Sequence, residues 1–148
     1  MAVIRPARES DIPRILELYR QLSLSAEPEQ EPSLDNYRQV FNEISAFSGY
    51  ELVVAEEQGE VIGTLVLLIV PNLSHNALPW AIVENMAVDE RRRRQGTGKL
   101  LMDYAIARAR EVGCYKIQLL SNKKRDEAHQ FYRTLGFEAS AHGFRFYL

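Results

Sequence analysis

The sequence has little cysteine, no long apolar segment and almost no net charge, and each of these shortages excludes a class of protein. Its one cysteine, Cys114, cannot form an intramolecular disulfide, and the first residues lack the apolar core of a secretory signal peptide. The longest apolar run, 61–70, is interrupted by glycine and threonine and is far shorter than the ~20 residues of a membrane helix. We therefore expect a cytoplasmic protein that does not interact with a membrane.

The net charge of -2 argues against a general nucleic-acid-binding surface. The one basic run, 91–94, is local, and the glycines beside it favour a phosphate ligand over a solvated turn or nucleic acid. The three histidines, His75, His129 and His142, lack the spacing of metal ligands, so no metal site is expected. Cys114 has no His-Asp or His-Asn pattern around it, which favours a small buried thiol over a nucleophile.

The chain of 148 residues contains no repeat, linker or low-complexity tract. A chain of this length can bury about 68 to 70% of its unfolded surface, which is enough for a core of its own. Hydrophobic residues make up 46% and charged residues 26%, as in ordinary soluble proteins. We therefore expect one domain that spans residues 1–148.

Hydrophobic periodicity and turn residues predict the order of the elements. Strands are expected at residues 3–7, 52–57, 60–70, 80–88 and 115–120, with a closing hairpin at 138–148. Helices are expected to begin at Ser10, Ser33, Thr97 and Asp126 and to end near Leu24, Phe47, Val112 and Leu135. Strand 80–88, the helix from Thr97 and strand 115–120 form a βαβ unit, so these two strands should be parallel neighbours.

The junction between strand 80–88 and the helix that follows is the most informative part of the chain. It reads V-E-N-M-A-V-D-E-R-R-R-R-Q-G-T-G-K-L-L, in which Gly96 and Gly98 allow a ligand to approach the backbone. The first turn of a helix offers unpaired N–H groups and the positive end of the helix dipole, which together bind phosphate. The pattern R-x-x-G-x-G is neither a Walker A loop nor the dinucleotide fingerprint.

Three blocks of the sequence resemble the GNAT superfamily of acetyl-CoA-dependent N-acetyltransferases. They are 84–88 on the strand, 93–98 as the family's [QR]-x-x-G-x-[GA], and 131–137 as its F-Y-x-x-L-G-F. The resemblance implies an α/β fold (α+β mixed sheet) with a central mixed sheet of about six to seven strands flanked by about four helices. It also implies direct transfer of an acetyl group from acetyl-CoA to a primary amine of a small molecule or peptide in a ternary complex.

The resemblance also assigns residues to acetyl-CoA. The residues that it places against the pantetheine arm, the pyrophosphate or a later part of the cofactor are Met86, Ala87, Val88, Arg93, Arg94, Gln95, Gly96, Thr97, Gly98, Lys99, Asn122 and Arg125. Many family members carry an asparagine seven residues before the tyrosine of the third block, where this chain has Arg125. Either Asn122 or Arg125 could make that contact.

Two side chains are candidates for proton transfer. Glu84 lies mid-strand among apolar neighbours, where a buried carboxylate would have a raised pKa and could act as a general base, directly or through water. The alternative is a carboxylate paired with a buried arginine. Tyr132 occupies the position at which many family members place the tyrosine that protonates the CoA thiolate; on spacing alone it would be a core tyrosine.

The acceptor and the assembly are less defined by the sequence. The segment 25–32 carries Glu27, Glu29 and Glu31, which could attract a cationic amine or could simply be solvated. A non-catalytic acyl-CoA-binding sensor of the same fold is the alternative to an enzyme. Either a monomer or a homodimer is compatible with the sequence.

Overall fold

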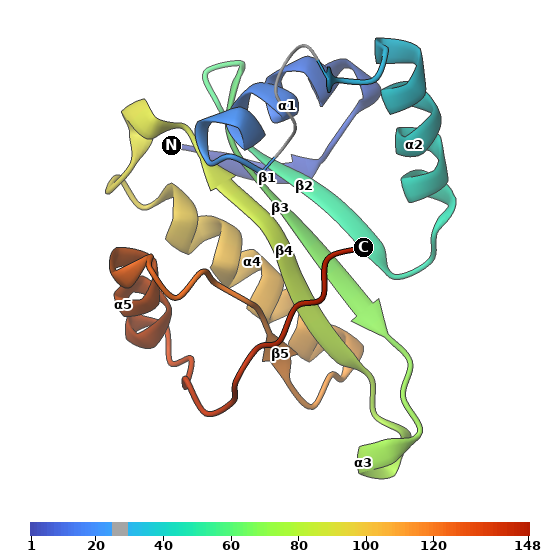
Figure 1. Cartoon of the computed structure of the whole chain (residues 1–148), viewed down its shortest axis with the longest axis vertical. Coiled ribbons are helices and arrows are strands. Elements are labelled where there is room, and N and C mark those ends of the chain that lie inside the picture. The colour runs from blue at the N-terminus through green and yellow to red at the C-terminus, as the bar shows by residue number, and fades with distance from the viewer. Residues whose placement is uncertain (25–29) are drawn as a thin grey trace. The chain divides into compact units, whose positions relative to one another are not determined.

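The computed structural model of the protein describes residues 1–24 and 30–148 (Figure 1). The chain divides into two units, Met1–Gln118 and Leu119–Leu148, and each is described by itself. Of the three glutamates that could attract a cationic amine or could simply be solvated, Glu27 and Glu29 lie outside the described residues. Glu31 is within them, and its carboxylate accepts a hydrogen bond from Arg20.

The first unit is built on a mixed sheet whose five described strands follow the order β1-β2-β3-β4-β5 (Figure 1). The strands are β1 Val3–Pro6, β2 Tyr50–Glu57, β3 Glu60–Val70, β4 Trp80–Val88 and β5 Ile117–Gln118. Neighbouring strands are antiparallel except β4 and β5, which are parallel. The predicted βαβ unit is therefore confirmed.

The four predicted helices are present in the predicted order, and the described residues add the four-residue helix α3 and short 3-10 turns. They are the 3-10 turns η1 Glu9–Asp11 and η3 Glu90–Arg92 and the helices α1 Ile12–Gln21, α2 Leu34–Ala46, α3 Ser74–Ala77, α4 Thr97–Val112 and α5 Asp126–Thr134. Ser33 caps α2, because its Oγ accepts the Asn36 N–H at 3.3 Å. Ser10 is not a cap: it lies inside η1, and α1 begins after Asp11.

Two helices cover opposite faces of the sheet. Ile15 and Leu18 of α1 pack with Val54 of β2 in one core cluster. A Cβ atom on Gly63 of β3 would instead meet Leu101 of α4. Because successive side chains of a strand alternate between faces, α1 lies on one side of β2 and β3 and α4 on the other.

The sheet has fewer strands than predicted. Six to seven were expected, whereas the described residues contain five. Strand 115–120 is reduced to the two residues of β5, and segment 138–148 contains no strand. Phe144 and Phe146 alternate as a strand would require, but both are exposed and no described strand pairs with them. A strand needs a partner edge as well as an alternating sequence, and the sequence alone does not show the partner.

The second unit contains α5, which ends as its sequence predicts. Gly136 has φ +97°, a left-handed conformation that glycine adopts without steric cost. The Phe137 N–H donates to the Tyr132 carbonyl at 3.1 Å and the Gly136 N–H to Arg133 at 3.0 Å, which is the Schellman arrangement. Across residues 1–24 and 30–148, no helix is both long and apolar enough to cross a membrane.

Candidate functional site

A bulge interrupts β4 in the middle of the first predicted block. Thr64 of β3 pairs with Ala87 of β4, and Val66 pairs with Glu84. Between these two pairs β3 advances by two residues and β4 by three, so β4 contains one extra residue. Asn85 lies inside this extra step with φ +50°, a left-handed conformation that asparagine tolerates better than most residues. The bulge therefore interrupts the regular alternation of side chains between Glu84 and Ala87.

The edge of β4 beyond the bulge has no strand beside it on the β5 side. Parallel pairing with β5 involves only Ala81 and Ile82. Within the described chain, no strand continues this pairing along residues 83–88. The backbone of Met86, Ala87 and Val88, which the family resemblance assigns to an extended pantetheine arm, can therefore accept a strand-like ligand at this edge.

Gly96 forms the N-terminal cap of α4, which follows β4 after η3. It has φ +89° and ψ 0°, and as a glycine it provides no capping side chain for the first-turn N–H groups. A Cβ atom on Gly96 would meet nothing within 4 Å, so the space over the cap is open. An anion fits there, because the first-turn N–H groups and the helix dipole both favour negative charge.

The arginines of the run differ in their ion pairs. Arg91 and Arg92 make ion pairs with acidic side chains of β2 and β3 and with Asp89. Arg93 makes no ion pair within residues 1–24 and 30–148, so its charge is available to a ligand. The residues 93–98, with Arg93, Gln95 and Gly96 exposed, are called the donor-binding loop below.

The first turn of α4 continues this loop. Thr97 is buried, at 5% exposure, and Gly98 is partly buried. Lys99 is exposed and pairs with Asp103 at 2.6 Å across one helical turn. An exposed i,i+4 pair is weak, about 0.3 to 0.5 kcal/mol, so this pairing leaves Lys99 able to face an anion.

Glu84 is exposed, and the prediction that it is buried is wrong. Its neighbours on the strand are apolar, but periodicity does not tell which positions of a face are covered by helices. Glu84 also has no ion pair among the described residues, so the alternative of a carboxylate held by a buried arginine is not supported. An exposed carboxylate on the bulged strand can meet an amine without first being uncovered.

Two tyrosines near Glu84 were not predicted as site residues. Burial raises the pKa of Tyr50, and the Glu84 charge raises it further. Burial also raises the pKa of Tyr19, with Tyr50 adding to the shift and a side-chain interaction with Asn85 opposing it. Both phenols are therefore protonated at neutral pH. The strand register places Tyr50 of β2 and Glu84 of β4 on the same face of the sheet. This grouping of Glu84 with the two tyrosines cannot be seen without the register.

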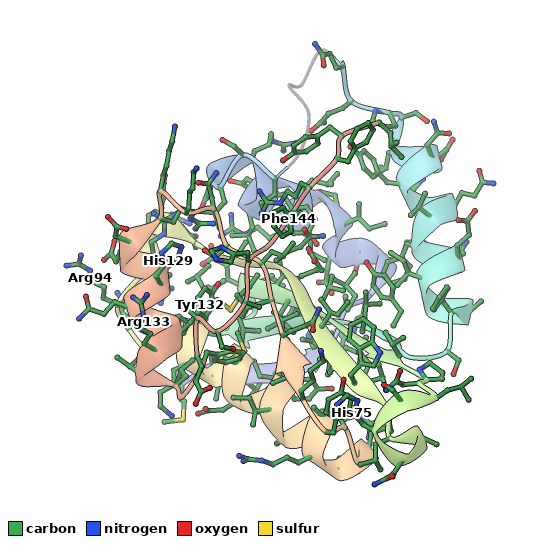
Figure 2. The ribbon with its side chains drawn as sticks, turned by 60° about the horizontal axis from the view of Figure 1, so that its bottom comes forward. His75, Arg94, His129, Tyr132, Arg133 and Phe144 are labelled. Atoms are coloured by element: carbon green, nitrogen blue, oxygen red, sulfur yellow. The ribbon has the colours of Figure 1, made fainter. Side chains whose placement is uncertain are left out.

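The remaining predicted residues belong to the second unit. The Asn122 side chain closes a turn, because its Oδ1 accepts the Lys124 N–H at 2.9 Å. Arg125 precedes α5 and makes no capping hydrogen bond with its side chain. His129 and Tyr132 both project from α5 (Figure 2), and His129 Nε2 lies 2.8 Å from the Asn122 carbonyl. Asn122 thus has a structural role in its own loop.

The Tyr132 phenol is suited to remain protonated. Its ring lies 5.4 Å from that of Phe131 and 5.9 Å from that of Phe137, between centroids. Burial raises the pKa of Tyr132, and the positive charge of Arg125 opposes part of this shift. A half-buried phenol that keeps its proton can act as an acid toward a stronger base.

The other reactive side chains do not form a site. Cys114 is partly buried, and burial raises the pKa of its thiol, which disfavours the nucleophilic thiolate. In the part of the chain that the structure describes, no three histidine, cysteine or acidic side chains gather as metal ligands would.

Comparison with known proteins identifies the family to which this fold and site belong. Residues 12–137 match the Acetyltransferase (GNAT) family, which is most of the chain and includes all three sequence blocks. The chain therefore belongs to this family. Its members are acetyltransferases that use acetyl-CoA.

Individual proteins are similar to the chain in sequence or in structure. The chain is 29% identical over 139 residues to a probable glucosamine 6-phosphate N-acetyltransferase of Drosophila melanogaster, covering 92% of this chain but only 60% of that protein. A putative acetyltransferase from Agrobacterium tumefaciens str. C58 is 36% identical, with a TM-score of 0.91 over 99% of both chains. A transcriptional regulator from Bacillus halodurans C-125 is 31% identical, with a TM-score of 0.91 over 100% of both. The predicted mixed α/β fold is confirmed, with five described strands in place of the six to seven expected.

Proposed function

We propose that the protein transfers the acetyl group of acetyl-CoA directly to a primary amine in a ternary complex. The observation that carries the proposal is the continuity of β4 and α4. A bulged strand with an unpaired edge runs through one short loop into a helix capped by Gly96. One continuous stretch therefore offers backbone groups for an extended arm and a positive helix end for phosphate.

The residues present fit the donor in both charge and shape. The open space over Gly96 would take the pyrophosphate, and Arg93, Arg94 and Lys99 would supply positive charge to it. Backbone groups of 86–88 would hold the pantetheine arm as another strand. Bound acetyl-CoA would supply the thioester whose acetyl group is transferred. Asn122 or Arg125 would make the additional contact with acetyl-CoA that many family members make through an asparagine.

Two side chains would move protons. Glu84 would accept a proton from the incoming ammonium, directly or through water, because only the neutral amine is a nucleophile. The neighbouring phenols of Tyr50 and Tyr19 would stay protonated beside it and could hydrogen-bond to the acceptor. Tyr132 would donate a proton to the departing thiolate. General acid and base catalysis each contribute about 10²- to 10⁴-fold.

The Drosophila relative suggests the first acceptor to test. Its name includes glucosamine 6-phosphate, a primary amine that also carries a phosphate. The test is release of free CoA thiol by the purified protein with acetyl-CoA and a panel of amines, among them this sugar, unphosphorylated glucosamine and a peptide amine. The proposal requires thiol release that depends on an amine and an acetylated product of matching mass.

A sensor without catalysis is the second candidate, favoured by the similarity to the Bacillus halodurans transcriptional regulator. Calorimetry separates the two. Acetyl-CoA binding without amine-dependent thiol release from any acceptor would favour the sensor. A protein that binds no acetyl-CoA would contradict both.

A further inference from the structure

Asp89 is a fully buried carboxylate between β4 and the donor-binding loop, and arginine groups surround it. Its Oδ1 accepts the backbone N–H of Arg91 at 3.0 Å, and its Oδ2 accepts from Arg91 Nη2 at 2.8 Å. Arg14 of α1 also donates to Oδ2 through Nη2. A buried charge is tolerated only with such complete pairing, so each of these contacts is structurally required.

The Asp89 backbone and its arginine partner are held by the β2–β3 hairpin. The Asp89 N–H donates to the Ile62 carbonyl at 2.9 Å, and Arg14 Nε donates to the Val61 carbonyl at 2.9 Å. Arg91 pairs with Glu60 at 3.2 Å. Asp89 therefore joins α1 and β3 at the point where the chain leaves β4.

Two further contacts hold η3 to the same elements. The Glu90 N–H donates to Gln21 Oε1, at the end of α1, at 2.9 Å. Arg92 Nη1 donates to Glu57 Oε2, at the end of β2, at 2.6 Å. Every residue from Asp89 to Arg92 is thus tied by at least one hydrogen bond to α1, to the hairpin or to Asp89 itself.

The donor-binding loop follows this segment directly and contains residues with positive φ angles. Arg94 has φ +62°, which a non-glycine residue adopts at a cost, and Gly96 has φ +89°. A costly conformation persists only where the surrounding structure over-determines it. The hydrogen-bonded segment 89–92 precedes this loop and α4 follows it, so both hold its ends.

We propose that Asp89 is a positioning residue that sets the geometry of the donor-binding loop by holding its preceding segment on α1 and the β2–β3 hairpin. This inference rests on the proposed function, because its readout is the affinity for acetyl-CoA. Asp89 itself touches no reacting atom. Its loss should weaken donor binding without changing the chemical step.

The test compares Asp89→Asn with a matched control, Asp11→Asn. Asp11 is also buried, accepts from Arg5 Nη1 and Nη2 at 2.8 and 3.0 Å and accepts the Arg8 N–H at 2.7 Å, and none of these hydrogen bonds involves residues 89–98. Asp89→Asn should raise KM and the calorimetric Kd for acetyl-CoA about 2- to 30-fold, with kcat unchanged. Asp11→Asn should lower stability and leave both constants unchanged.

Gln21→Leu provides a second variant that does not disturb a buried charge. It removes the acceptor of the Glu90 N–H and should raise KM by a smaller factor, which decides the question if Asp89→Asn does not fold. Equal KM values for the wild type and for every folded variant of the loop contacts would overturn the inference. So would an equal rise in Asp11→Asn, because the effect would then be general instability. Wild-type protein that binds no acetyl-CoA would instead contradict the proposed function.

Discussion

Gly63 of β3 lies against Thr97 in the first turn of α4, so closely that a Cβ atom on Gly63 would be 3.2 Å from Thr97 Cγ2. The same atom would be 3.1 Å from Leu101 Cδ1 and 3.3 Å from the Ala87 carbonyl oxygen. The missing side chain of Gly63 therefore sets how near α4 comes to β3 and β4. These contacts place the helix N-terminus beside the strand that would hold the pantetheine arm.

Gly63→Ala should move the first turn of α4 and weaken acetyl-CoA binding. The Ala87 carbonyl belongs to the sheet and yields little, so the added methyl must displace Thr97 and Leu101. Overpacking of this kind costs about 1 to 3 kcal/mol of unfolding free energy. Calorimetry measures the affinity and denaturant unfolding the stability. Gly59→Ala is the control: its φ is +78° with nothing nearby, so it should lose stability but retain affinity. Unchanged affinity in Gly63→Ala would contradict the prediction.

Gly96→Glu should abolish acetyl-CoA binding in a folded protein, because a carboxylate would occupy the position proposed for the pyrophosphate. Gly113→Glu is a closely matched control at the other end of α4. Gly113 has φ +91°, Gly96 has φ +89°, and a Cβ on either meets nothing within 4 Å. Each change should cost about 1 to 2 kcal/mol of backbone strain. Titration calorimetry decides: if both variants bind equally, the pyrophosphate lies elsewhere.

Glu84→Gln should lower turnover by about 10²- to 10⁴-fold, with part of the loss regained at high pH, where more of the acceptor amine is already neutral. Because Glu84 is exposed, melting temperature and acetyl-CoA affinity should hardly change. Glu111→Gln, at an exposed position near the end of α4, should leave turnover unchanged. A wild-type rate for Glu84→Gln at neutral pH would remove Glu84 from the mechanism.

The strand and the helix around the site could be predicted because proline and glycine residues indicate where they begin or end. Strand 80–88 follows Pro79, and α4 lies between two glycines with positive φ, Gly96 and Gly113, so the bounds predicted for both elements match the structure. Such residues impose a local backbone preference that needs no knowledge of the rest of the fold. The phosphate-binding character of the loop follows from the same local features.

The environment of Glu84 could not be predicted in this way. Whether a strand position is covered depends on which helices pack on that face, and the bulge at Asn85 changes the register beyond it. An asparagine that tolerates positive φ was the only local signal of the bulge. Tyr50 was missed because its place beside Glu84 depends on the pairing of three strands. Asp89 had a local signal, since an aspartate after a strand often closes a turn.

The stability contributed by Asp89 should be lost in acid. Hydrogen bonds from the Arg91 side chain and backbone, with Arg14, hold its pKa well below the usual range, although burial opposes them. The carboxyl group has a lower pKa in the folded protein than in the unfolded chain, where it is about 3.9. Its contribution to stability is therefore complete above about pH 3.9 and is lost as the pH falls below that value. Asp89→Asn should therefore cost about 3 to 5 kcal/mol at pH 7 and progressively less below about pH 4. Urea unfolding between pH 7 and 3 measures this, and a constant difference would contradict it.

Tyr132→Phe should separate the packing role of the Tyr132 ring from the proposed proton donation by its hydroxyl. The ring packs with Phe131 and Phe137, so phenylalanine preserves the contacts, and melting temperature and acetyl-CoA affinity should change little. Turnover should fall by about one order of magnitude or more, because the acid that protonates the thiolate is lost.

The pH dependence and a second tyrosine make the Tyr132 prediction specific. Because burial raises its pKa above the ordinary 10, wild-type turnover should not lose this acid at any pH below 10. Tyr104→Phe is the control: the Tyr104 hydroxyl donates to Glu51 at 2.8 Å, and burial and this bond raise its pKa to about 12. That variant should lose some stability but no turnover. Full turnover of Tyr132→Phe, measured where the chemical step limits the rate, would make Tyr132 structural and leave His129 or water as the proton donor.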